Sequence, residues 1–208
     1  MKALNRRPLG LRDWSFIKSS ARALSGMSIT PNQISIASIG FSAAAAWCLA
    51  ALPADIVLNS LLTVVFITLR GLCNVFDGMV AIEGGKSTKS GELFNDIPDR
   101  ISDPLILVAA GYAIGGTDFW PVLGWAAALL AVGTAYVRTL ARSMGAPSDF
   151  RGPMAKTHRM AVVAVACLLT PFIGPYAMIF GLNVIIFGCI ITIWNRARAA
   201  YLFLEGKA

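Results

Sequence analysis

Acidic side chains gather in one region of a chain that is otherwise strongly apolar. Hydrophobic residues make up 56% of the 208 residues and charged residues only 14%, with 11 Asp and Glu in all. Five of those 11 lie close together along the chain: Asp77, Glu92, Asp96, Asp99 and Asp103. Because a carboxylate is costly in an apolar environment, such a concentration indicates a functional site.

The first part of this group lies on one face of a helix. Asn74, Asp77, Gly78 and Ala81 have the spacing i, i+3, i+4, i+7, which places their side chains on one side of an α-helix. The small residues at 78 and 81 leave room beside the polar groups, either for a ligand or for a closely packed neighbouring helix. Arg70 precedes Asn74 on the same helix and could either pair with the acidic residues or tie two helices together.

A second polar face follows after a short link. Asn95 and Asp99 are four residues apart, and Asp96, Asp99 and Asp103 form an adjoining stripe. The link, residues 83–91, is rich in Gly and Ser, so we expect two antiparallel neighbouring helices whose polar faces oppose each other. Opposed carboxylates and amides offer only oxygen ligands, which suit Mg²⁺, Mn²⁺ or Ca²⁺.

Membrane-spanning helices must position these residues. A spanning helix needs about 20 mainly apolar residues. We expect spans at about 31–52, 57–80, 92–116, 120–144, 157–174 and 176–195. The third stretch is apolar only over 104–116 and reaches full length if its helix begins near Glu92. The expected fold is therefore an all-α integral membrane protein with six transmembrane helices in a single domain, 1–208. Within its cytoplasmic segment 1–30, residues 11–24 fit an amphipathic interfacial helix.

The basic residues predict the orientation of these spans. The chain carries a net charge of +7, and most of its 18 Lys and Arg lie before span one, between spans two and three, between spans four and five, or after span six. The three opposite turns contain none. The positive-inside rule therefore places both termini and the acidic site at the cytoplasmic face, in what we expect to be a bacterial inner membrane. This topology explains the positive charge, so no nucleic-acid partner is expected.

The segment from Asn74 to Asp99 resembles the signature of the CDP-alcohol phosphatidyltransferase family, D-x2-D-G-x2-A-R-x8-G-x3-D-x3-D. Every spacing of that signature is kept over 26 positions. The matching residues, in order, are Asn74, Asp77, Gly78, Ala81, Ile82, Gly91, Asn95 and Asp99. The six spans and the entry Thr30-Pro31-Asn32-Gln33 into the first of them are also similar to that family.

This resemblance implies transfer of a phosphatidyl group from CDP-diacylglycerol, or a related CDP-linked lipid, to the hydroxyl of a small alcohol with release of CMP. It implies Mg²⁺ or Mn²⁺ as cofactor, and a homodimer. The expected metal ligands are Asp77, Asp99, Asn74 and Asn95, and Asp99 is also the expected base for the hydroxyl proton. The expected nucleotide-binding residues are Asn32, Asn74, Gly78, Ala81 and Gly91.

Basic residues between spans four and five are candidates for binding the acceptor alcohol. They are Arg138, Arg142, Arg151, Lys156 and Arg159. Orientation and lipid headgroups account for most of them, but Arg138 lies on the helical continuation of span four, from which it could reach an anion in the site. The resemblance implies a phosphorylated acceptor such as glycerol 3-phosphate.

The chain departs from the family signature at three positions. The first and third aspartates are Asn74 and Asn95, and the arginine is Ile82. The charge of the four ligand positions falls from −4 to −2, so a second divalent ion should bind more weakly unless Asp96 or Asp103 turns inward. We prefer a relative with altered metal use. The alternatives are a non-catalytic relative that binds CDP-lipid and, less favoured, a small transporter that uses the acidic cluster.

Overall fold

The computed structural model describes residues 19–20, 26, 29–83, 85, 90–116 and 119–207, without the side chains of Ile82, Glu83 and Glu92. The predicted amphipathic helix over residues 11–24 lies outside these residues, apart from Ser19 and Ser20.

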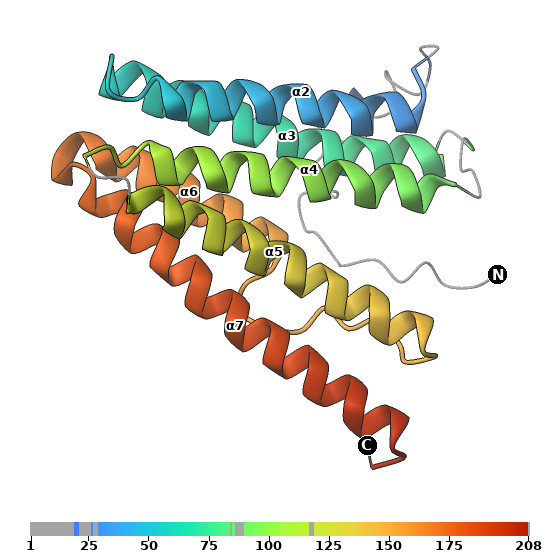
Figure 1. Ribbon diagram of the computed structural model, residues 1–208. Coiled ribbons are helices and arrows are strands. Elements are labelled where there is room, and N and C mark those ends of the chain that lie inside the picture. Colours follow the sequence, from blue (N-terminus) through green and yellow to red (C-terminus); the bar gives the residue numbers. More distant parts are fainter. Residues whose placement is uncertain are drawn as a thin grey trace.

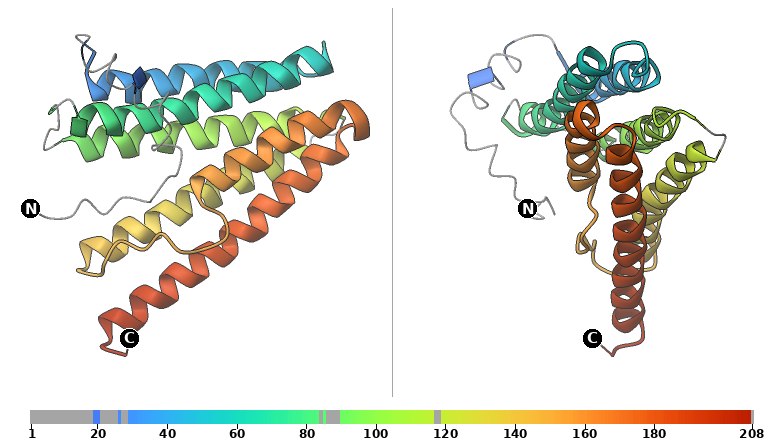
Figure 2. Two further views of the ribbon diagram at one scale, coloured as in Figure 1. Left: turned by 180° about the vertical axis from the view of Figure 1, so that it is seen from behind. Right: turned by 90° about the vertical axis from the view of Figure 1, so that its left-hand side faces the viewer.

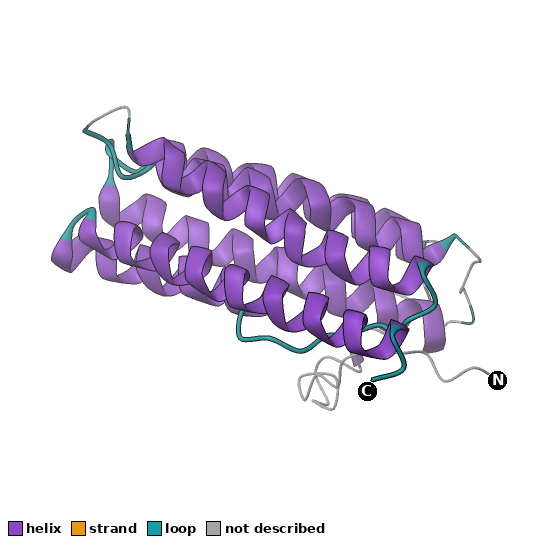
Figure 3. Cartoon of the chain, turned by 60° about the horizontal axis from the view of Figure 1, so that its bottom comes forward, coloured by secondary structure: helices purple, strands orange, loops and turns teal. Residues whose placement is uncertain are grey.

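Six long α-helices, and no strands, form the described part of the chain (Figures 1 and 3). They are α2 (Pro31–Ala50), α3 (Ile56–Glu83), α4 (Gly91–Tyr112), α5 (Trp120–Ser143), α6 (Lys156–Ile173) and α7 (Tyr176–Leu204). The all-α prediction is confirmed, and each predicted span corresponds to one helix. The largest difference in bounds is at α7, which continues to Leu204 instead of ending at 195.

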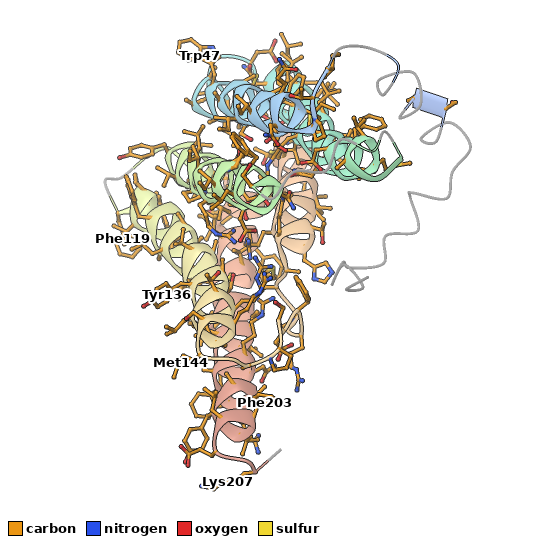
Figure 4. All side chains as sticks on the ribbon, turned by 90° about the vertical axis from the view of Figure 1, so that its right-hand side faces the viewer. Trp47, Phe119, Tyr136, Met144, Phe203 and Lys207 are labelled. Atoms are coloured by element: carbon orange, nitrogen blue, oxygen red, sulfur yellow. The ribbon has the colours of Figure 1, made fainter. Side chains whose placement is uncertain are left out.

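Five of these six helices are long and apolar enough to cross a membrane, which makes the chain a multi-pass membrane protein. The exception among the described helices is α4, because its first half carries the charged residues of the acidic cluster. The bundle exposes large apolar side chains, as a lipid-facing surface requires. Trp47, Phe119 and Tyr136 point outward from three different parts of the bundle (Figure 4).

The six helices are connected through pairwise contacts. α2 packs against α3 and α4, α5 packs against α4 and α7, and α6 joins α3 to α7. α5 and α7 diverge from α2, α3 and α4 toward the end of the bundle at which α3 ends and α4 begins (Figures 1 and 2). α3 and α4 are antiparallel, as expected, but the main packing neighbours of α3 are α2 and α6, and those of α4 are α2 and α5. Long side chains, rather than a packed backbone interface, therefore connect α3 to α4.

Two glycines allow α4 and α5 to approach closely. A Cβ atom at Gly124 would lie 2.7 Å from the backbone oxygen of Leu107 and 2.9 Å from the Cα atom of Gly111. Small residues at a crossing allow membrane helices to pack backbone against backbone. This contact sets the position of α4 relative to α5, and with it the position of the charged first half of α4.

Replacing Gly124 with Ala should destabilise the bundle, because the added methyl group would overlap backbone atoms that cannot move aside. Overpacking of this kind costs about 1–3 kcal/mol. The thermal unfolding midpoint can be followed in detergent with a thiol-reactive dye, since Cys48, Cys73, Cys167 and Cys189 are free and buried. Gly40→Ala is the matched control, because nothing lies within 4 Å of its added Cβ atom. Equal midpoints for the two variants would contradict this account of the crossing.

Candidate active site

A buried arginine links α3 to α4. Nη2 of Arg70 on α3 donates to Oδ1 of Asp99 at 3.3 Å and to Oδ1 of Asp103 at 2.5 Å, both on α4. All three residues are buried, and Arg70 is only 1% exposed. Asp99 and Asp103 of α4 therefore face α3, and Arg70 has the interhelical position expected of a charged residue inside a membrane bundle.

Helix α6 brings two more cations to the same carboxylates. Nη2 of Arg159 donates to Oδ2 of Asp103 at 2.5 Å, and its Nε donates to the same oxygen at 3.1 Å. Lys156 Nζ forms an ion pair with Oδ2 of Asp99. Asp99 and Asp103 are four residues apart on α4, and Lys156 and Arg159 are three apart on α6. Each pair therefore shares one helical face, and the two faces meet in register.

The carboxylate of Asp77 lies beside this cluster. Ser35 on α2 donates its hydroxyl to Oδ2 of Asp77 at 2.6 Å, and both residues are buried. Asp77 is also within electrostatic range of Lys156 and Asp99. Asn74, one turn earlier on α3, donates its amide to the carbonyl oxygen of Arg70 at 3.0 Å. Asn74 and Asp77 thus lie on one face of α3, as their spacing predicted.

The remaining acidic residues of α4 have other partners. Asp96 accepts from Nη2 of Arg138 on α5 at 3.2 Å and pairs with Arg100 on α4 at 3.3 Å. Asn95 is exposed. Asp103 does turn inward, but toward Arg70 and Arg159. Neither Asp96 nor Asp103 therefore replaces the carboxylates that the signature lacks.

A pocket opens between α4, α5 and the start of α6. Its cavity volume is about 100 Å³, smaller than that of a typical drug-sized ligand site, and it is open to solvent on one side. Its lining residues are Asp96, Asp99, Arg100, Thr134, Ala135, Arg138, Phe150, Ala155, Lys156, Arg159 and Arg196. Three of the five predicted acceptor-binding residues line it: Arg138, Lys156 and Arg159. The other two, Arg142 and Arg151, are exposed and are not among the lining residues.

The loop from α5 to α6 is held against α7, and this contact positions Lys156 and Arg159 in the site. The backbone N–H of Met154 donates to Oγ1 of Thr192 at 3.0 Å. Gly152 has φ +118°, and a Cβ atom there would lie 2.6 Å from the side chain of Thr192. A glycine is therefore needed both for the backbone conformation and for the close approach.

Arg196 completes this support and was not predicted from the sequence. It donates from Nε to the carbonyl oxygen of Arg151 at 3.0 Å and from Nη1 to that of Thr134 at 2.7 Å, so it ties α7 to α5 and to the loop. The expected sixth span ended at 195, so Arg196 was interpreted as an orientation charge. Ser35 was missed as well, because a serine on an apolar helix gives no signal of its partner.

The predicted nucleotide-binding residues lie apart from this pocket. Asn32 is half-buried at the start of α2, Gly78 is buried on α3, Ala81 follows it one turn later, and Gly91 begins α4. None of these lines the pocket between α4, α5 and α6. Asn74, Gly78 and Ala81 share one stretch of α3.

The donor groups are of the type that binds a hard cation. Asp77, Asp99 and the amides of Asn74 and Asn95 offer only oxygen, the ligand type of Mg²⁺ and Mn²⁺. Both oxygens of Asp99, however, already accept from Arg70 and Lys156. Within the part of the chain that the structure describes, no three His, Cys, Asp or Glu side chains come together as metal ligands.

The CDP-alcohol phosphatidyltransferase family model matches residues 28–194, so this chain belongs to that family of membrane transferases. A search of the curated proteins found no match to this sequence. Three solved structures of Mycobacterium tuberculosis phosphatidylinositol phosphate synthase (PgsA1) share its fold. The complex with manganese and citrate has a TM-score of 0.74 at 21% identity and covers 89% of this chain and 88% of that one. The form with CDP-DAG bound also gives 0.74 at 21%, with 90% and 94% covered, and the apo form gives 0.69 at 22%, with 88% and 95% covered.

Asp103→Asn should be strongly destabilising, because it leaves the buried guanidinium groups of Arg70 and Arg159 without their shared carboxylate. Removing one partner of a buried ion pair costs about 3–5 kcal/mol. The thermal unfolding midpoint in detergent measures the loss. Glu205→Gln is the control, since its ion pair with Lys207 is 3.9 Å long and half-exposed and should contribute little. A midpoint for Asp103→Asn equal to that of the control would show that the cluster does not hold α3, α4 and α6 together.

Proposed function

We propose that this chain transfers the phosphatidyl group of CDP-diacylglycerol, or of a related CDP-linked lipid, to the hydroxyl of a small phosphorylated alcohol such as glycerol 3-phosphate, releasing CMP. One observation carries the proposal. The pocket brings Asp99, which matches the last aspartate of the family signature, together with the guanidinium groups of Arg138 and Arg159. A carboxylate able to take a proton and cations able to bind a phosphate therefore open onto the same space.

In the proposed reaction Asp99 takes the proton of the acceptor hydroxyl. The hydroxyl oxygen forms a bond to the lipid-side phosphorus, and the bond from that phosphorus to the oxygen of CMP breaks. Arg70 and Lys156 contact the carboxylate of Asp99 and hold it in position beside the pocket. Arg159 and Lys156 also place positive charge where negative charge builds up on the phosphoryl oxygens.

A divalent cation, Mg²⁺ or Mn²⁺, would be held by Asp77 and Asp99, with the amide oxygens of Asn74 and Asn95 as neutral ligands. When bound, it would supply neutralisation of the pyrophosphate and of the leaving CMP. The cytidine is proposed to bind along Asn32, Asn74, Gly78, Ala81 and Gly91, because the small residues among them leave room for a ligand close to the backbone.

The acceptor is proposed to carry a phosphate because of the cations that line the pocket. Arg138 reaches it from α5, Arg159 from α6 and Arg196 from α7. Guanidinium groups from three helices can surround a dianion that no single helix could hold. Arg142 and Arg151 are exposed, and we assign them to membrane orientation and lipid headgroups.

The positions of the cations also support the proposed orientation. The start of α4, the end of α5 and the C-terminal end of α7 lie at the same end of the bundle (Figure 1), and all three of these helices supply lining residues of the pocket. By the positive-inside rule that end faces the cytoplasm, in a bacterial inner membrane by our proposal. The homodimer implied by the resemblance stays a prediction.

Purified protein with CDP-diacylglycerol and Mn²⁺ should release CMP only when a suitable alcohol is added. A panel that pairs glycerol 3-phosphate and inositol phosphate with glycerol and inositol, read by mass spectrometry of CMP, identifies the acceptor class. Release with the phosphorylated members alone is the expected result. Asp99→Asn should lower the rate by at least about 100-fold, because it removes the proton acceptor. No CMP with any alcohol would disprove the transferase proposal for this chain.

Arg138→Met should raise the KM for the phosphorylated acceptor about tenfold or more, because a charge-assisted contact to the phosphate is lost. The KM for CDP-diacylglycerol should change by less than threefold. Arg198→Met, on an exposed part of α7, removes the same charge outside the pocket and is the control. An equal rise in both KM values would place Arg138 outside the acceptor site.

A further inference from the structure

We propose that the ammonium group of Lys156 takes the place of one divalent cation, so that the site holds no more than one Mg²⁺ or Mn²⁺ ion. The inference deepens the proposed function and rests on it for the role of Asp99. In this proposal the main role of Lys156 is to pair with the carboxylate of Asp99, and its role in the acceptor pocket is secondary.

The partners of Asp99 are the first observation. Its Oδ1 accepts from Nη2 of Arg70 at 3.3 Å and its Oδ2 pairs with Nζ of Lys156. A second divalent ion would need an oxygen of this carboxylate as a ligand. Here each oxygen already has a cation from a different helix, and the side chain of Asp99 is only 9% exposed. A second ion at Asp99 would have to displace the ammonium group.

Charge balance is the second observation. Three carboxylates, those of Asp77, Asp99 and Asp103, lie in the buried cluster. Three cations face them, Arg70, Lys156 and Arg159, within ion-pair or electrostatic range. The cluster is therefore neutral before any metal binds. One divalent ion would be matched by the two negative charges of a CDP-lipid pyrophosphate. A second would leave two uncompensated positive charges in a buried site, which is strongly unfavourable.

The acidic residues that could restore the balance are already paired. Asp96 accepts from Arg138 and pairs with Arg100, and Asp103 is already counted in the balance through its pairs with Arg70 and Arg159. The signature positions that would add a carboxylate are instead the amides of Asn74 and Asn95. The neutral amides at 74 and 95 and the ammonium group beside Asp99 both lower the negative charge available to a metal ion.

The location of Lys156 is the third observation. It is the first residue of α6, whose first turn contains no acidic residue and also carries Arg159. A cation is disfavoured at a helix N-terminus, where the dipole is positive. The carboxylates of Asp99 and Asp103 offset that cost, so the two cations in the first turn of α6 depend on these two residues of α4. Because the ammonium group is part of the chain, its positive charge is present beside Asp99 at any metal concentration.

Counting bound Mn²⁺ tests the proposal without any turnover. Full-length protein in detergent with CDP-diacylglycerol and no acceptor is titrated with Mn²⁺, and free Mn²⁺ is read by electron paramagnetic resonance. Wild type should bind no more than one Mn²⁺ per chain. Lys156→Met should bind Mn²⁺ at least tenfold more tightly, because a positive charge is removed beside a metal ligand. Lys156→Arg keeps the cation and should behave as wild type. Lys207→Met, which removes a lysine outside the pocket, is the matched control.

Two results would overturn the proposal: two Mn²⁺ per wild-type chain at saturation, or an unchanged Mn²⁺ affinity in folded Lys156→Met. If that variant does not fold, the wild-type count alone decides. A purely structural lysine would lower the unfolding midpoint of Lys156→Met without tightening Mn²⁺ binding. The count is independent of CMP release, so a chain that transfers nothing to any acceptor would disprove the proposed function and leave this measurement unaffected.

Discussion

Charge neutrality in a dry environment is the constraint on which this structure depends. Arg70 is almost fully buried inside a membrane bundle, and it is tolerated only because Asp99 and Asp103 accept from it. Those two carboxylates in turn are tolerated because α6 supplies Lys156 and Arg159. α3 and α4 lack a packed backbone interface of their own, so these ion pairs help define how the two helices stand relative to each other.

Contacts between α7 and the loop before α6 position the start of α6 beside Asp99 and Asp103. Its two cations lie on the first turn of the helix, so any shift of the preceding loop would move both of them. The loop is held by backbone contacts to α7: Met154 donates to Thr192, and Arg151 accepts from Arg196. Arg196 lies on the part of α7 beyond residue 195, so this part of the helix also supports the site.

Hydropathy and charge spacing were enough to predict the six helices, the acidic face of α4 and the facing position of Arg70. They could not predict which cation neutralises which carboxylate. Lys156 and Asp99 are separated by 57 residues, and nothing local distinguishes Lys156 from the exposed Arg151 nearby. Lys156 differs from Arg151 because the loop before α6 places the first turn of that helix beside Asp99. Asp103 shows the same limit: Arg70 was named as a possible partner of the acidic residues, but nothing in the sequence indicated that Arg159 would share the carboxylate of Asp103.

The two asparagines of the signature and the lysine of α6 are best understood together. Taken alone, Asn74 and Asn95 look like losses, because each exchanges a carboxylate for a neutral amide that binds a divalent ion less strongly. Four carboxylates would not be neutral beside Arg70, Lys156 and Arg159 either, since Asp103 already balances part of that charge. With amides at 74 and 95, the remaining carboxylates equal the cations that the chain itself provides. The departures from the family pattern therefore fit the proposal that Lys156 takes the place of one divalent cation.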